Sequence, residues 1–390
     1  MEFGGGGNVF ERHVDVSGTL AVVGAGDFRF GSDQGRAFLF DFSNANDIQQ
    51  IAELRASDNS AGNMYAQGVA ISGHYVFVGA SGDSEGRGAV YMYDVSDRSN
   101  VIERKITAFD GGSGFGFSLA VDANRLIVGA PFSANTAPAA AYIIDFSDPG
   151  NLQQTKITPN LPGLGSRFAE SVAISGDYAI VGRPSESAAF PFAAGSAYLY
   201  DISDLNAIES KRLTPTDVPN YSRFGARVAI DGTKALVSVS SDPGPTNNAG
   251  TTDGAVWAFD FSDWNNVVQY EYGRPVPNFG GPAPPFGRFL DLEGDLAFAG
   301  AFNEDSIRGA LYIHDVSNVL APKQLLRLPA HANHDIRFGT SFAVDGQTLL
   351  VSDSEGHVYI YALVPEPTSS LLMAAAMCAL VVVRIGRERR

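Results

Sequence analysis

The stretch FGFSLAVDANRLIVGAP, residues 115–131, decides the fold. Two short apolar runs, 119–121 and 126–128, lie on either side of a turn at Ala123-Asn124. Apolar runs joined by so short a polar turn are typical of a β-hairpin, and Asn tolerates the positive φ angle of such a turn better than most residues. The stretch therefore predicts two antiparallel strands, with Asn124 providing the turn conformation.

The same pattern recurs seven times along the chain. Each copy begins with an aromatic residue, at Phe10, Tyr65, Phe115, Phe168, Phe224, Phe286 and Phe338. A small residue follows fourteen positions later, at Gly24, Gly79, Gly129, Gly182, Ser238, Gly300 and Ser352. The other six copies have Gly in the turn, at Gly18, Gly73, Gly176, Gly232, Gly294 and Gly346. A constant internal offset within copies of unequal length indicates one structural unit repeated seven times.

Each unit continues into a third and a fourth predicted strand, as at 88–94 and 102–107 in the second copy. Between them stands an Asp followed two positions later by Ser, a pair that favours a turn. These Asp residues are Asp41, Asp94, Asp145, Asp201, Asp260 and Asp315, and we interpret them as turn formers rather than as a catalytic set. A four-stranded sheet cannot bury both faces alone, whereas seven sheets stacked around an axis can. The sequence therefore predicts an all-β fold, a seven-bladed β-propeller of four-stranded antiparallel blades over residues 8–363, with blades starting near 10, 65, 115, 168, 224, 286 and 338.

The motif Phe115-Gly116 through Gly129-Ala130-Pro131 resembles the FG-GAP repeat of integrin-α-like propellers, and the likeness covers roughly residues 10–363. In many FG-GAP blades, a loop of alternating Asp and Asn between the first two strands binds calcium. Here that place is a tight hairpin such as Asp231-Gly232-Thr233, which is too short to surround an ion. We therefore expect no metal site and no cofactor, and we interpret His331, His334 and His357 as solvated loop residues.

The composition excludes several kinds of function. The 390 residues carry a net charge of −16, which repels phosphate backbones and makes nucleic acid an unsuitable partner. The single cysteine, Cys378, excludes a disulfide within the chain and a site built from several cysteines.

The C-terminal segment, residues 364–390, has a different character. It contains Pro-Glu-Pro, an apolar run at 371–383 and a basic end, and it predicts a transmembrane helix over about 369–385 with the basic end in the cytoplasm. This order resembles the PEP-CTERM sorting signal of bacterial exported proteins. The resemblance implies export to the cell envelope, outer surface or extracellular space, transient inner-membrane anchoring by the tail, and an exosortase-type processing enzyme as partner. The sorting residues would be Pro365, Glu366, Pro367, Arg384, Arg387, Arg389 and Arg390. A plain uncut anchor is the alternative.

The beginning of the sequence does not fit this picture. Residues 1–7 have neither the charged start nor the apolar core of a signal peptide. The seventh blade also ends near Leu363 without a recognisable fourth strand. We hypothesise that residues upstream of Met1 hold both a signal peptide and the strand that closes this blade.

Any ligand site is expected on the face formed by the second-to-third strand loops and the loops between blades, here called the variable face. These loops differ in length and content, and binding usually resides in loops on a rigid scaffold. Aromatic and acidic side chains there are suited to sugars, although the same residues also serve to pack loops. The candidates are Phe28, Phe30, Asp83, Glu85, Phe190, Phe192, Phe302, Glu304 and Asp305.

The sequence thus favours an exported, non-enzymatic propeller that binds extracellular polysaccharide or envelope proteins. Two other interpretations stay open. One is a carbohydrate-active enzyme, a glycosidase or lyase, that uses carboxylates of the variable face, since a glycosidase needs two carboxylates at a defined separation. The other is a purely structural surface component.

Overall fold

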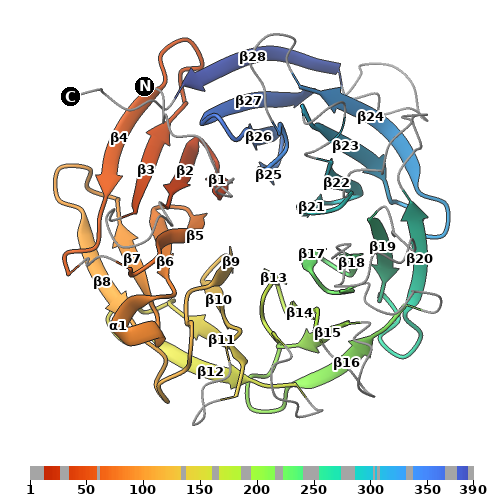
Figure 1. Ribbon diagram of the computed structural model, residues 1–390, viewed down its shortest axis with the longest axis horizontal. Helices are drawn as coiled ribbons and strands as arrows, with labels where there is room; N and C mark the ends of the chain where they lie inside the picture. The colour runs from red at the N-terminus through yellow and green to blue at the C-terminus, as the bar shows by residue number, and fades with distance from the viewer. Residues whose placement is uncertain are drawn as a thin grey trace, which may run out of the picture.

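The computed structural model describes residues 13–26, 35–58, 62–132, 138–159, 167–185, 195–215, 223–239, 254–273, 286–301, 304, 308–330, 337–364 and 376–384. These residues form seven four-stranded antiparallel sheets arranged around one axis (Figure 1). The prediction of an all-β, seven-bladed propeller is confirmed.

The blades follow the order of the chain. Blade one contains β1 (Val14–Ser17), β2 (Leu20–Ala25), β3 (Arg36–Asp41) and β4 (Gln49–Leu54). Blade two contains β5 (Tyr65–Ser72), β6 (Tyr75–Ala80), the short α1 (Asp83–Gly86), β7 (Ala89–Asp94) and β8 (Ile102–Ile106). Blade three contains β9 (Ser118–Asp122), β10 (Arg125–Ala130), β11 (Ala140–Asp145) and β12 (Gln153–Ile157). Blade four contains β13 (Val172–Ser175), β14 (Tyr178–Arg183), β15 (Ser196–Asp201) and β16 (Glu209–Leu213).

The remaining blades repeat this order. Blade five contains β17 (Arg227–Asp231), β18 (Lys234–Val239), β19 (Ala255–Asp260) and β20 (Val268–Gly273). Blade six contains β21 (Leu290–Glu293), β22 (Leu296–Ala301), β23 (Ala310–Asp315) and β24 (Lys323–Pro329). Blade seven contains β25 (Ser341–Asp345), β26 (Thr348–Ser352), β27 (His357–Val364) and β28 (Ala376–Arg384). In every blade the first strand lies nearest the centre and the fourth lies outermost (Figure 1).

The core lies between neighbouring blades. Seven clusters of buried apolar side chains each join two blades, and the last joins Val14 and Phe38 of blade one to Ala343 and Leu350 of blade seven. Burial of apolar area is the main favourable term in folding. Because both faces of each sheet are buried only in the closed ring, the blades stabilise one another.

The two fixed positions of the repeat have packing roles. Phe115 is fully buried and packs edge-on against Tyr142 of the same blade, with ring centroids 5.3 Å apart. The other described aromatic positions make the equivalent contact with a third-strand Tyr or Trp. At the small position, a Cβ on Gly79 would lie 2.1 Å from the carbonyl oxygen of Gly116 in the next blade. The aromatic position therefore fixes the packing within a blade, and the small position allows the close contact with the next blade.

One turn differs from the prediction. Ala123, not Asn124, adopts the positive φ angle of 48° in the hairpin of blade three. Strand register explains the difference. Asp122 pairs with Arg125, which places Ala123 at the position that Gly occupies in the other blades.

Blade seven also differs from the prediction. Strand β28 pairs antiparallel with β27 and fills the outermost position, so in this structure the tail segment supplies the fourth strand of blade seven. The helix expected over 369–385 is therefore wrong for residues 376–384, and none of the described helices is long and apolar enough to span a membrane. The physical reason is that β27 would otherwise present an unpaired edge, and the β-branched run 381–383 suits a strand.

Candidate functional site

The two faces of the propeller are built differently. On the hairpin face, the side chain before each turn bonds to the turn of the next blade. Ser17, Asp122, Ser175, Asp231, Glu293 and Asp345 each accept a backbone N–H from the Gly in the neighbouring turn. Ser72 instead donates its hydroxyl to the carbonyl oxygen of Ala123. All seven interfaces carry such a bond, so this face is a uniform structural ring.

The inner strands enclose a central channel of about 660 Å³. Asp15 and Asp291 line it, and each accepts one N–H from its own strand and one from the next blade, at 2.8–2.9 Å. Burial raises the pKa of Asp15 to about 7 and that of Asp291 to about 8, and nearby carboxylates, including Asp345 and Glu293, add to the effect. These two carboxyl groups therefore titrate near neutral pH.

On the variable face, a buried third-strand Tyr holds a loop acid, and a base from the fourth strand neutralises it. In blade two the Tyr91 hydroxyl donates to Asp83 at 2.7 Å, and Lys105 lies 2.9 Å from the same carboxylate. Asp58, from the loop between blades, shares both partners. Burial opposes ionisation of Asp83, but hydrogen bonds from Ser84, Lys105 and Tyr91 outweigh it and lower the pKa.

The same arrangement recurs in two other blades. In blade three the Tyr142 hydroxyl donates to Asp110 at 2.7 Å, and Lys156 pairs with that acid. In blade six Tyr312 donates to Glu304 at 2.8 Å, and Arg327 pairs with it at 2.7 Å. Each acid comes from a loop of the variable face, so the cluster fixes that loop to the rigid sheet.

The predicted ligand-binding residues are placed unequally. Asp83 and Glu304 are buried and hold loops through Tyr and a base, whereas Glu85 is exposed and has a positive φ angle of 62°. Arg384 ends β28. The other candidates lie outside the described residues: Phe28, Phe30, Phe190, Phe192, Phe302, Asp305, Pro365, Glu366, Pro367, Arg387, Arg389 and Arg390. Of the described candidates, Asp83 and Glu85 lie two residues apart in α1 of blade two, whereas Glu304 belongs to blade six and Arg384 to blade seven.

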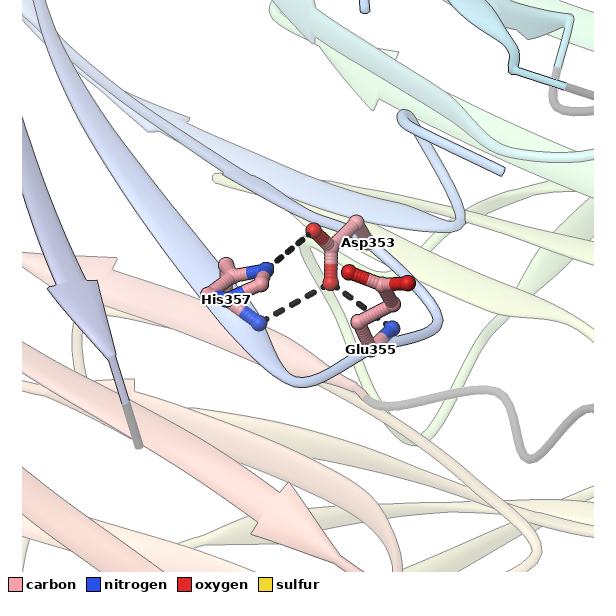
Figure 2. Close-up of side chains that lie close together, drawn as sticks. All are labelled: Asp353, Glu355 and His357. Atoms are coloured by element: carbon pink, nitrogen blue, oxygen red, sulfur yellow. Dashed lines mark hydrogen bonds and ion pairs between the residues drawn. The ribbon is translucent and has the colours of Figure 1, made fainter. Parts of the chain in front are cut away.

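A cluster that sequence reasoning missed lies between β26 and β27. Asp353, Glu355 and His357 place their ligand atoms within 4.8 Å of one another (Figure 2). His357 was expected to be a solvated loop residue, which is wrong: it is 7% exposed and its Nδ1 lies 2.6 Å from Asp353 Oδ2. The signal available in the sequence was the tetrapeptide Asp-Ser-Glu-Gly, which occurs at 353–356 and also at the candidate residues 83–86.

Two segments of the chain match the FG-GAP repeat. They are residues 48–93 and 152–200. Each match begins at the outermost strand of one blade and ends in the third strand of the next, so the matched unit spans the interface between two blades. No curated protein matches the chain.

A solved structure gives further support for the fold. It is described as a hypothetical selenium-binding protein from Sulfolobus tokodaii, and it superposes with a TM-score of 0.52 at 10% identity. The match covers 90% of this chain and 87% of that protein. At this identity the likeness shows the fold alone, and the chemistry of this propeller follows from its own residues.

Proposed function

We propose that this FG-GAP β-propeller is a non-enzymatic binding module, exported and held at the cell surface or in the extracellular matrix, that binds polysaccharide or another envelope protein on its variable face. The observation that carries the proposal is the anchoring of individual loops by acid–Tyr–base clusters of one type, in which the acid, the loop it comes from and the base change between blades. A rigid scaffold with individually shaped loops is the common design of binding proteins.

The contrast between the two faces supports the choice of surface. The hairpin face repeats one hydrogen bond around the ring, whereas the variable face differs in its acids, its bases and its loop lengths. In the described clusters of blades two, three and six, the carboxylates pair with Lys or Arg. Carboxylates held in this way shape loops, and that role favours recognition over acid–base catalysis.

Binding and turnover should be measured together. Purified full chain is incubated with the producer's extracellular polysaccharide, and bound protein and released reducing ends are followed. We expect saturable binding without release. Replacing Phe190 and Phe192 by Ala should weaken binding, and Asn124→Ala on the hairpin face should leave it unchanged. Release of reducing ends would show an enzyme, and no binding to polysaccharide or envelope extract would show a structural component; either result overturns the proposal.

Export and sorting form a separate part of the proposal, carried by the likeness of residues 364–390 to a PEP-CTERM tail. We expect an exosortase-type enzyme to remove the tail, so that the surface protein has a lower mass than the full chain. Replacing Pro365, Glu366 and Pro367 by Ala should retain the full mass and keep the protein in the membrane fraction. Equal masses for both proteins would contradict processing without affecting the binding result.

A further inference from the structure

Blades two, three and six share one charge arrangement on the variable face. In each, the base stands directly opposite the Tyr in the strand register, as Lys105 does for Tyr91. The equivalent pairs are Tyr142 with Lys156 and Tyr312 with Arg327. The base therefore lies where it neutralises the loop acid that the Tyr hydroxyl holds.

Blade seven has the acid and the Tyr but a different residue at the base position. The Tyr359 hydroxyl donates to Asp353 at 3.3 Å, as in the other three blades. The residue opposite Tyr359 in the register is Val382, which carries no charge, and a base, Arg384, stands opposite His357 instead. The loop adds a second carboxylate, Glu355, and an imidazole, His357, at the same place (Figure 2).

The backbone of this loop fixes the orientation of Asp353. Its Oδ1 accepts the N–H groups of Glu355, Gly356 and His357 at 2.8–2.9 Å. Its Oδ2 faces the imidazole Nδ1 of His357, and the carboxylate of Glu355, the more exposed of the three side chains, completes the group. One oxygen of Asp353 thus accepts the three backbone N–H groups, and the other lies beside the His357 imidazole and accepts the Tyr359 hydroxyl.

We propose that Asp353, Glu355 and His357 form a binding site for a first-row divalent transition-metal ion, which lies beside the acid that the Tyr hydroxyl holds, where a Lys or Arg opposite the Tyr lies in blades two, three and six. One imidazole and two carboxylates suit zinc or manganese better than calcium, which prefers oxygen ligands alone. The site lies in the second-to-third strand loop of blade seven, away from the short hairpins of the inner strands. It goes beyond the proposed binding function and does not depend on it.

The geometry needs only a small adjustment to admit the ion. Two ligand atoms that each lie about 2.1 Å from a zinc ion are about 3.0 Å or more apart. His357 Nδ1 and Asp353 Oδ2 are 2.6 Å apart, so the ion requires them to separate by a few tenths of an ångström. Asp353 can keep its three backbone hydrogen bonds because these use the other oxygen. Water would complete the coordination on the side of Glu355, the more exposed of the three residues.

Zinc alone, titrated into tag-free full chain and measured by calorimetry and by elemental analysis after dialysis, tests the proposal. We expect one ion per chain. Glu355→Gln should weaken binding about tenfold or more. The matched control is Glu85→Gln, in the same Asp-Ser-Glu-Gly sequence of blade two, where Lys105 already pairs with Asp83; it should leave the affinity unchanged.

A second variant keeps the test independent of folding. His357→Gln keeps a neutral hydrogen-bonding side chain at this buried position, so we expect a folded protein with an unchanged circular dichroism spectrum and no zinc uptake. Replacing His331 and His334 by Ala should retain the ion. The proposal is wrong if zinc fails to bind at millimolar concentration, if Glu355→Gln and Glu85→Gln weaken binding equally, or if uptake follows His331 and His334.

Discussion

The central channel makes stability depend on pH through Asp15 and Asp291. Both side chains lie among the inner strands, where burial raises the pKa of Asp15 from 3.8 to about 7 and that of Asp291 to about 8. Between the unfolded and the folded pKa, the folded state binds more protons than the unfolded state. Stability is therefore highest on the acid side of this range and falls as the pH rises through about 7 and 8.

The magnitude follows from the same pKa values. A difference of one in pKa corresponds to about 1.4 kcal/mol. Between pH 5.5 and 8.5, Asp15 would account for roughly 2 kcal/mol and Asp291 for roughly 3 kcal/mol as upper limits. Both side chains remain partly accessible to water in the channel, which reduces the effect. We expect about 2 kcal/mol in total, or about 3 °C in Tm for a domain of this size.

The perturbation is the double variant Asp15→Asn and Asp291→Asn, compared with wild type by thermal unfolding at several pH values from 5.5 to 8.5. The Tm of wild type should fall relative to that of the variant as the pH rises. Comparing the two proteins cancels the contribution of buried His314, whose pKa is lowered to about 4 and which acts in the opposite sense. Asp122→Asn, which also lines the channel, serves as a control for the effect of an Asp-to-Asn substitution on Tm at a single pH. Parallel Tm curves for wild type and the double variant would refute the reasoning.

Three further predictions concern backbone conformation and ring closure. Ala123→Gly should stabilise the protein by about 0.5 kcal/mol in urea unfolding. It relieves a left-handed Ala, which is unfavourable by about 1–2 kcal/mol, but part of this gain is offset because Gly loses more chain entropy on folding. Gly176→Ala should destabilise the protein by about 1 kcal/mol, and changes of the same sign in both variants would contradict the prediction. Asp345→Ala should destabilise the protein by about 1–2 kcal/mol, because it removes the hydrogen bond from the Gly18 N–H that joins blade one to blade seven. Hydrogen exchange at the Gly18 N–H should become faster, and an unchanged exchange rate would contradict this bond. Ala362→Cys should form a disulfide with Cys378 under mild oxidation, because the two residues are register partners in β27 and β28; a disulfide-linked dimer or free thiols would contradict the pairing.

The propeller was predictable because its signals are local and repeated. The aromatic position, as at Phe115, and the small position, as at Gly79, each have a packing contact that recurs in most blades. The turn of blade three was assigned to the wrong residue because register, which depends on Asp122 pairing with Arg125, decides which position takes the positive φ angle. The preference of each residue type for a positive φ angle would by itself have favoured Asn124 over Ala123 in this turn.

The site was less predictable because side-chain roles depend on distant partners. Asp83 and Glu304 resemble surface acids in the sequence, but Tyr and Lys or Arg side chains from strands eight or more residues away bury them. The Asp353 cluster becomes visible only when blades are compared position by position. The register, which no single-blade pattern contains, identifies Val382 as the residue that replaces a base.

The tail segment 376–384 presents a choice between two structures. In β28 its backbone groups pair with β27, whereas in a membrane-spanning helix they would pair within the segment, and one segment cannot do both at once. Leaving blade seven would expose the edge of β27, and staying in it would withdraw the apolar run from the membrane. The Ala362→Cys variant therefore also tests sorting. If the tail anchors the chain during export, a preformed bond to Cys378 should keep the protein out of the membrane fraction, and reduction should restore it; anchoring that is unaffected by the bond would show that β28 and the anchor do not compete.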